Sequence, residues 1–211
     1  MAFKHDISDV KASVDGKIVS SPELIKRFGG ERIFEVKIEC KRTSGVVDTF
    51  KLNYSSNLGV VLKKNMFIHI EGDIRTVNST KESDLVVGCI IFAKSVKILD
   101  DEPELYCNEV FIDNAKIHEF ISIRKSYNDD TIDVADYKIS VHRGHGRYSY
   151  FKASSFDGDA IFIGNVHKSI KSLTIKCRLC GSKSRDKSDR CFFYLAVYHL
   201  DAHFKDKEDK E

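Results

Sequence analysis

Alternation of apolar and polar residues is the most frequent pattern along the chain, and this period of two predicts half-buried β-strands. The clearest run is FEVKIECK at residues 34–41. A second run, ADYKISVH at residues 135–142, begins 101 positions later. In both runs the apolar side chains fall on one face and the polar side chains on the other, so each predicts a strand with one buried face.

The offset between the two runs persists through the following turn and strand, where Gly45 matches Gly146, Phe50 matches Phe151 and Lys51 matches Lys152. Upstream, Gly16-Lys17-Ile18 matches Ala115-Lys116-Ile117 at an offset of 99. Loop insertions produce such small changes of offset. A repeat of about 100 residues is too long for a solenoid and indicates a domain duplication.

Each half is predicted to run strand, long loop, strand, hairpin, strand, short helix, strand, loop, strand, with the helices near residues 57–64 and 159–170. Five strands with a helix between the third and fourth follow the order of an OB-fold barrel. We therefore predict a mainly all-β chain of two tandem OB-fold five-stranded barrels. An SH3-like barrel or a split sandwich is the competing fold. The predicted domains are 1–104, ending in the acidic linker DDEPE, then 105–201, then a charged tail at 202–211.

Three stretches of the second half resemble the bacterial single-stranded DNA-binding proteins: NEVFIDNAKI, DYKISVHRGHGRYSYFKASSFDGDA and IKCRLCGSK. The pattern is a first strand ending in a small residue plus Lys-Ile, a second ending near an arginine, and a third with an aromatic pair before a basic residue. The resemblance is closest to the tandem-OB relatives of that family in Firmicutes. It covers residues 108–200 better than residues 12–99. It implies binding of single-stranded DNA without catalysis, and oligomerisation through the barrels.

Two features depart from the family's pattern. The chain contains no tryptophan, so none is present at the stacking positions. The C-terminal sequence DAHFKDKEDKE carries mixed charge and lacks the acidic, aromatic-ended tip through which the family recruits replication and repair proteins.

Strand parity locates a candidate binding surface on the third strand of the second half. The outward positions there are Tyr148, Tyr150, Lys152, Ser154 and Phe156. Aromatic side chains beside a cation suit sequence-tolerant binding of single strands, in which bases stack and phosphates are neutralised. The corresponding outward residues of the first half are VTKNS at alternate positions 47–55, with one cation and no aromatic group. Alternatively, the aromatic residues cover a helix or a partner barrel.

Charge also favours the second half. The whole chain has a net charge of +2, but residues 137–190 contain 12 lysines and arginines against 4 acids, whereas the first 104 residues contain 16 of each. In the predicted fourth strand, outward Glu71 and Asp73 of the first half correspond to Lys176 and Arg178 of the second. The basic loop GSKSRDKSDR follows, and this loop position contacts oligonucleotides in OB folds.

We therefore predict a non-catalytic single-stranded DNA-binding protein acting in DNA replication, recombination or repair. Its DNA surface lies on the second barrel, and its first barrel is a degenerate docking, dimerising or auxiliary module. Tyr148, Tyr150 and Phe156 are predicted to stack on bases. The residues predicted to hold phosphates are Arg143, Arg147, Lys152, Lys176 and Arg178. The basic loop from Lys183 to Arg190, which includes Arg185 and Lys187, is predicted to bind the nucleic acid by closing over the strand. The predicted partners are single-stranded DNA, further copies of the chain and replication or repair proteins. The alternative is a tandem-OB protein-interaction adaptor without DNA binding.

Other chemistry has little support in the sequence. Cys177 and Cys180 have the CxxC spacing of zinc and redox sites, but they fall within a predicted strand and no second CxxC follows. His142 and His145 fall in a Gly-rich hairpin, for which the preferred interpretation is a flexible turn. This turn carries four potential phosphate donors, namely His142, Arg143, His145 and Arg147. No phosphate loop, dinucleotide fingerprint or hydrolase motif is present. We expect no cofactor, no metal, reduced cysteines and a cytoplasmic protein without a membrane span.

Overall fold

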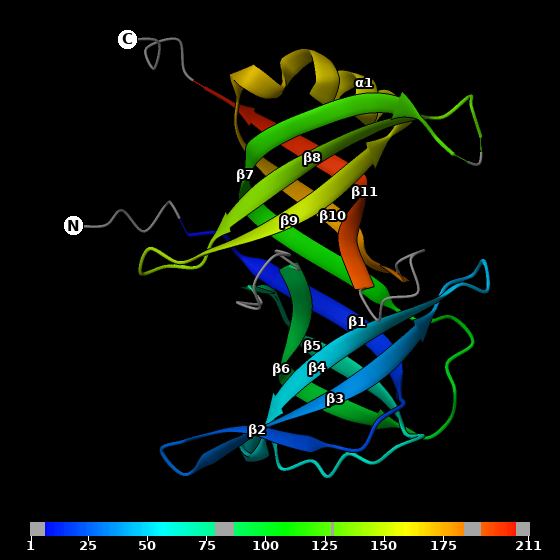
Figure 1. Ribbon diagram of the computed structural model, residues 1–211, viewed down its shortest axis with the longest axis vertical. Helices are drawn as coiled ribbons and strands as arrows, with labels where there is room; N and C mark the ends of the chain where they lie inside the picture. The colour runs from blue at the N-terminus through cyan, green and yellow to red at the C-terminus, as the bar shows by residue number, and fades with distance from the viewer. Residues whose placement is uncertain (1–6, 79–86, 128, 184–190, 206–211) are drawn as a thin grey trace. The chain divides into compact units, whose positions relative to one another are not determined.

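The computed structural model describes residues 7–78, 87–127, 129–183 and 191–205, and it is mostly β, as predicted (Figure 1). The chain divides into two compact units, each assembled from separate segments. The first unit comprises Lys11–Glu109 and Gly181–Phe193, and the second comprises Met1–Val10, Val110–Cys180 and Tyr194–Glu211.

The strands that build the first unit pair as a closed ring. They are β1 Val10–Ile18, β2 Glu23–Phe28, β3 Glu31–Lys41, β4 Val47–Ser55, β5 Phe67–Asn78 and β6 Val87–Leu99. Their order is β1-β5-β6-β4-β3-β2, and an additional pairing of β1 with β3 closes a ring of five strands. Strand β2 is added outside that ring, on β3.

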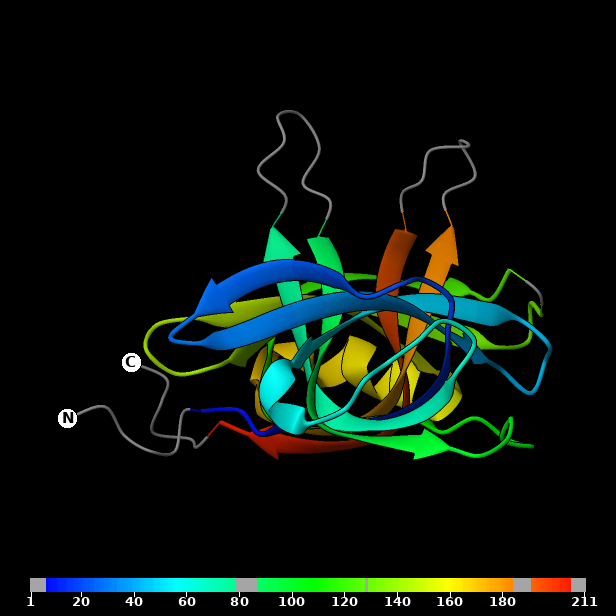
Figure 2. The ribbon, with the colours of Figure 1, turned by 90° about the horizontal axis from the view of Figure 1, so that it is seen from below.

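The second unit repeats the five-stranded ring. Its elements are β7 Asn108–Lys125, β8 Asp133–His142, β9 Tyr148–Phe156, α1 Asp157–Val166, β10 Ile170–Lys183 and β11 Cys191–Phe204. The strand order is β10-β11-β9-β8-β7, closed by a pairing of β10 with β7. Figure 2 shows β5 beside β6 and β10 beside β11. The pair β4–β6 and its counterpart β9–β11 are both parallel.

Registers in the two units agree with the sequence repeat. In the first, Lys17 lies opposite Glu39, which lies opposite Thr49. In the second, Lys116 lies opposite Ser140, which lies opposite Tyr150. The predicted inward faces are buried except at Phe34, which is half-buried. The buried residues are Val36, Ile38 and Cys40 on β3, and Ala135, Tyr137, Ile139 and Val141 on β8.

The structure differs from the sequence-based prediction in the connections. The helix predicted near residues 57–64 is wrong, because only the short 3-10 helix Ser56–Leu58 forms. Gly59 ends it in a left-handed conformation (φ 68°). The helix predicted near residues 159–170 forms as α1, followed by the 3-10 helix His167–Ser169. The predicted long loop before β3 contains β2, which reaches β3 through the left-handed turn Gly29-Gly30.

The prediction that Asp73 faces outward is also wrong, because a bulge interrupts the β5–β6 pairing between Glu71 and Gly72. A bulge inserts an extra residue and breaks the simple alternation of faces. Asp73 is buried, and its two carboxylate oxygens accept hydrogen bonds from Arg75 Nε (2.9 Å) and Nη2 (3.2 Å).

Gly72 at this bulge offers a direct test of the packing between β5 and β6. A Cβ at this position would lie 2.1 Å from the backbone oxygen of Phe92, so Gly72→Ala must force the two strands apart. We expect the free energy of unfolding to fall by about 1–3 kcal/mol, the usual cost of overpacking, as measured by urea titration followed by circular dichroism. Gly158→Ala in α1 is the control, since nothing lies within 4 Å of its Cβ and alanine favours helix. An unchanged stability for Gly72→Ala would contradict the tight approach.

His69 of β5 joins two carboxylates in the first unit. Its Nδ1 lies 2.7 Å from Asp15 Oδ1 and its Nε2 lies 2.9 Å from Glu71 Oε1. A neutral imidazole has only one N–H, so donation to both acids requires the protonated ring. Burial alone would lower the pKa of His69, but the hydrogen bonds to Asp15 and Glu71 outweigh it and raise the pKa above its ordinary value of 6.5. The other oxygen of Asp15 accepts from the backbone N–H of Cys107 (2.8 Å).

Because the folded-state pKa of His69 is raised, its contribution to stability is complete below pH 6.5 and is lost as the pH rises through the folded-state pKa. We expect His69→Gln to be less stable than the unmodified chain at pH 6, with the difference shrinking as the pH rises. Urea unfolding at several pH values measures this difference, with His145→Asn in an exposed turn as the control for loss of a histidine. A difference that does not change with pH would contradict the assignment.

Candidate nucleic-acid interface

The outward row of β9 lies largely as strand parity predicts. Tyr148 and Tyr150 are 49% and 42% exposed, Phe156 is 38% exposed, and Lys152 is also exposed. Ser154 is the exception, because it is buried and its hydroxyl donates to Asp136 Oδ1 (2.6 Å). Inward Phe151, Ala153 and Ser155 are all buried.

Two histidines extend the tyrosines into a continuous aromatic surface across three strands. The ring of His142 on β8 stacks on Tyr148 with centroids 4.7 Å apart and an interplanar angle of 18°. Tyr148 and Tyr150 lie 6.4 Å apart, and the ring of His118 on β7 meets Tyr150 edge-on at 5.0 Å. On β8, Ser140 lies between Lys116 of β7 and Tyr150 of β9. The small Ser140 side chain leaves room for the rings of His118 and Tyr150 to meet. We call His118, His142, Tyr148 and Tyr150 the aromatic row.

Neither histidine of the aromatic row was predicted to contribute its ring to the site, and His142 was predicted only as a potential phosphate donor of the turn. His142 is the last residue of β8, as the run at residues 135–142 predicted, and the unpredicted feature is that its ring stacks on Tyr148. His118 lies where the register between β7 and β8 shifts, between Ile117 and Glu119. Alternation places His118 on the same strand face as Lys116, two residues earlier. Because the register shifts at this point, the direction of the His118 side chain cannot be predicted from alternation.

Lys152 differs electrostatically from its repeat counterpart Lys51. The Lys51 ammonium lies 2.8 Å from Glu35 Oε1. The residue of the second unit that corresponds to Glu35 is Asp136, and its carboxylate already binds Arg124 Nε (2.7 Å) and the Ser154 hydroxyl. Neighbouring Lys138 is paired with Glu119. Within the residues that the structure describes, Lys152 therefore has no ion-pair partner beside the aromatic row.

Arg143 and Arg147 flank the hairpin that joins β8 to β9, next to His142 and Tyr148. The backbone N–H of Arg143 donates to the carbonyl of Arg147 (2.8 Å). The residues between them have positive φ, with Gly144 at 82°, His145 at 52° and Gly146 at 70°. The predicted turn is therefore confirmed, and it places both arginines at one end of the aromatic row.

The structure does not bring Lys176, Arg178 and Phe156 to the aromatic row. Lys176 and Arg178 are exposed on β10, where Lys176 lies opposite Phe111 on the half of β7 that pairs with β10. Phe111 precedes Lys116 by five residues, or roughly 17 Å along a strand. Phe156 ends β9, opposite Val134.

The basic loop predicted to close over the strand falls mostly outside the described residues, namely Arg185, Lys187, Arg190 and the side chain of Lys183. The residues on either side of it, Gly181 and Phe193, belong to the first unit. The Gly181 N–H donates to Asp48 Oδ1 (2.8 Å), and the Phe193 ring lies 6.3 Å from Phe50. The role of the loop in DNA binding stays a prediction.

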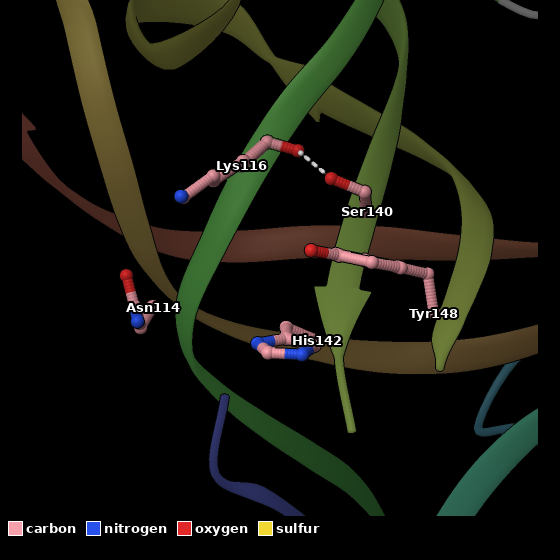
Figure 3. Close-up of a pocket in the computed structure, with 5 residues that line it drawn as sticks. All are labelled: Asn114, Lys116, Ser140, His142 and Tyr148. Atoms are coloured by element: carbon pink, nitrogen blue, oxygen red, sulfur yellow. Dashed lines mark hydrogen bonds between the residues drawn. The ribbon is translucent and has the colours of Figure 1, made fainter. Parts of the chain in front are cut away.

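A small polar pocket opens beside the aromatic row. It is lined by Asn114 and Lys116 of β7, Ser140 and His142 of β8, and Tyr148 of β9 (Figure 3). The Ser140 hydroxyl donates to the carbonyl of Lys116 at 3.5 Å, which holds the two strands together at the pocket. Of its lining residues, only Tyr148 was among the predicted binding residues.

Cys40, Cys89, Cys177 and Cys180 have the environment of core residues rather than of nucleophiles. Cys177 and Cys180 are both buried, and Cys177 Sγ donates to the carbonyl of Val110 (3.4 Å). Burial, together with Asp48, raises the pKa of Cys40 to about 12, and burial raises that of Cys89 to about 12. Both therefore stay neutral thiols. The described part of the chain contains no cluster of three His, Cys, Asp or Glu residues able to hold a metal ion.

Two solved structures share this arrangement over nearly the whole chain. The wild-type single-stranded DNA-binding protein from Thermus aquaticus is 14% identical, with 95% of each chain covered and a TM-score of 0.70. A deletion mutant of the same protein is 15% identical, with 97% of this chain and 99% of that chain covered and a TM-score of 0.69. At such identities the likeness shows a common fold, which confirms the predicted structural resemblance to bacterial single-stranded DNA-binding proteins.

The sequence comparisons add no further assignment. No protein-family profile matches the chain, and no curated protein sequence matches it. In the part of the chain that the structure describes, no helix is long and apolar enough to cross a membrane.

Proposed function

We propose that the chain is a non-catalytic single-stranded DNA-binding protein of two tandem OB-fold barrels, related to the bacterial single-stranded DNA-binding family. The observation that carries the proposal is the aromatic row on the outer face of β7, β8 and β9, beside Lys152. Exposed aromatic rings and cations on one sheet face suit stacked bases and a phosphate backbone.

The two kinds of side chain contribute differently to binding. Stacking of a base on Tyr148 or Tyr150 is worth roughly 1–3 kcal/mol and tolerates any base, because every base has a π-face. Lys152, Arg143 and Arg147 neutralise phosphates and release condensed counterions, which makes the affinity fall with salt.

The first unit is proposed as an auxiliary, docking or dimerising module. Its counterpart of Tyr150 is Thr49, and its counterpart of Ser140 is Glu39, opposite Lys17. Lys51 is neutralised by Glu35. The counterparts of Tyr148, Tyr150 and His142 on this sheet face therefore include no aromatic group, and its lysines Lys17 and Lys51 lie beside the acids Glu39 and Glu35.

The setting of this function is inferred from the fold and the resemblance together. A single-strand binder of this class acts in DNA replication, recombination or repair, and we place the protein in the cytoplasm, as a homo-oligomer that works with replication or repair proteins. We also propose that the chain is related to the tandem-OB members of this family in Firmicutes.

An exposed apolar patch favours a second candidate, a protein-interaction adaptor that keeps the barrels without binding DNA. Ile161 and Phe162 of α1 and Phe204 of β11 are exposed, and the rings of Phe162 and Phe204 meet edge-on at 6.3 Å. Exposed apolar side chains gathered in this way mark interaction surfaces. The binding measurements below separate the two functions.

Binding of the full chain to a labelled oligo-dT is expected to be tight at low salt and to weaken steeply as salt rises, with a slope of about −0.7 per phosphate contact. Fluorescence anisotropy at several salt concentrations measures the slope, and an unlabelled duplex of the same length is the competitor. The duplex should fail to displace the oligonucleotide, because its bases are not available for stacking. Absence of binding at low salt would overturn the proposal and favour the adaptor.

Substitutions at the aromatic row and beside it should act differently. Tyr150→Ala should weaken oligo-dT binding by about 5- to 150-fold, the equivalent of 1–3 kcal/mol for one stacked base. Lys152→Met should reduce the salt slope by about 0.7 to 1, the share of one phosphate contact. Anisotropy titrations of each variant measure both effects.

Lys51→Met and Tyr127→Ala are the matched controls, as the repeat counterpart of Lys152 and as an exposed tyrosine away from the row. Both should bind as the unmodified chain does. If Tyr150→Ala and Lys152→Met keep full affinity and salt slope while the chain still binds oligo-dT, the site lies elsewhere on the protein.

A further inference from the structure

We propose that the pocket beside the aromatic row accepts one base of the bound strand and distinguishes its edge, favouring guanine over adenine. This inference rests on the proposed single-stranded DNA binding and adds a sequence preference to it. The pocket lies between β7 and β8, with Tyr148 of β9 beside it (Figure 3).

The β7 wall of the pocket is shaped by a bulge. Ala115 lies opposite Leu173 and Ile112 lies opposite Ile175, so Asp113 and Asn114 together face the single residue Thr174. Asn114 adopts a left-handed conformation (φ 55°), which is uncommon for a residue other than glycine. Bulges redirect side chains and are frequent next to functional sites.

Ser8 connects the two walls of the pocket. Its hydroxyl donates to the Asn114 carbonyl (2.9 Å) and accepts from the His142 N–H (3.0 Å). The Ser8 N–H donates to the His142 carbonyl (2.9 Å), and Ser8 is itself buried. The backbone positions of Asn114 and His142 are therefore fixed before any ligand arrives, which lowers the entropic cost of binding.

The side chains around the pocket suit an aromatic ring with acceptors on its edge. His142 covers one face of Tyr148, which remains half exposed for a base to stack on. In Figure 3 the Tyr148 hydroxyl points toward β7, and the Lys116 ammonium and the Asn114 side chain lie at the far edge of that strand; all three residues line the pocket. An ammonium donates hydrogen bonds and accepts none.

Of these groups, only the Lys116 ammonium discriminates between the purines, because the Asn114 amide carries both donors and an acceptor and can bond either one. Guanine presents two neighbouring acceptors, O6 and N7, and a lysine donating to them is among the commonest base contacts. Adenine replaces O6 with an amino donor, which would point its hydrogens at the Lys116 ammonium. The pocket therefore favours guanine, and Lys116 is the residue that determines the preference.

The first unit has no equivalent pocket chemistry. The repeat counterparts of the five lining residues are Asp15, Lys17, Glu39, Lys41 and Val47. Two of them are acids, none is aromatic, and the Asp15 carboxylate is bonded to His69 and to the Cys107 N–H. A preference for guanine would thus belong to the second unit.

The test compares oligo-dT strands that carry one central guanine, adenine or hypoxanthine as competitors against labelled oligo-dT. We expect the guanine strand to bind at least about 5-fold more tightly than the adenine strand, the lower end of the range for base-edge contacts. The hypoxanthine strand, which keeps O6 and N7 but lacks the 2-amino group, should bind as the guanine strand does. Lys116→Met should bring the guanine-to-adenine ratio close to 1. Lys152→Met is the control and should lower both affinities in parallel, leaving the ratio unchanged.

The outcomes separate the two proposals. Tight binding of oligo-dT with equal affinities for guanine and adenine strands would overturn the pocket assignment and leave single-stranded DNA binding intact. An equal loss of both affinities in Lys116→Met, with the ratio kept, would make Lys116 a phosphate contact and also overturn it. Failure to bind any of the strands would overturn the proposed function itself.

Discussion

Closure of each strand ring around a packed interior is the constraint on which the rest of the structure depends. On β8, Ala135, Tyr137, Ile139 and Val141 are fully buried, and the Tyr137 hydroxyl bonds Ser155 of β9 at 2.8 Å inside the ring. A slip of one residue would expose all four side chains and bury their polar neighbours, so the register is strongly fixed. The outward residues are then held in rows without contributing to the core. Lys116, Ser140 and Tyr150, for example, lie side by side on the outer face of three strands because the buried residues next to them fix the register.

The two units show how one register supports different surfaces. In both, a lysine stands at the same place on the third ring strand, and the difference lies in its acid neighbour. Glu35 is available to Lys51, whereas Asp136 is occupied by Arg124 and Ser154. An exposed ion pair contributes little to stability, so either arrangement suits folding. For an anionic ligand the arrangements differ sharply, because a paired lysine offers little net charge. Under the proposed function, the arrangement of a few surface pairs is what distinguishes the DNA-binding unit from the auxiliary one.

Alternation alone predicts the regular strands, and it fails where the pairing is irregular. Strands β3, β8 and β9, their inward faces and the exposure of Tyr150 and Lys152 follow from a period of two. His118, Asn114 and Asp73 do not, because each lies at or beside a bulge whose position is set by the partner strand. The lack of an ion-pair partner for Lys152 among the described residues was not predictable either, since it depends on Arg124 of β7 binding Asp136 on the neighbouring strand β8. The prediction of a helix near residues 57–64 was wrong for a local reason. Gly59 adopts a left-handed conformation and ends the short 3-10 helix after one turn.

A face that tolerates any sequence and a pocket that prefers one base can coexist on the same sheet. Stacking and counterion release depend on features that all nucleotides share, so they determine how tightly a strand is held. A contact to a base edge acts on one nucleotide at a time and determines which register of the strand is favoured. The bulge at Asn114 separates sequence-tolerant binding from base recognition, because it moves one residue of β7 out of the regular outer face, and this residue lines the pocket. A strand would thus be bound along the row and aligned at the pocket.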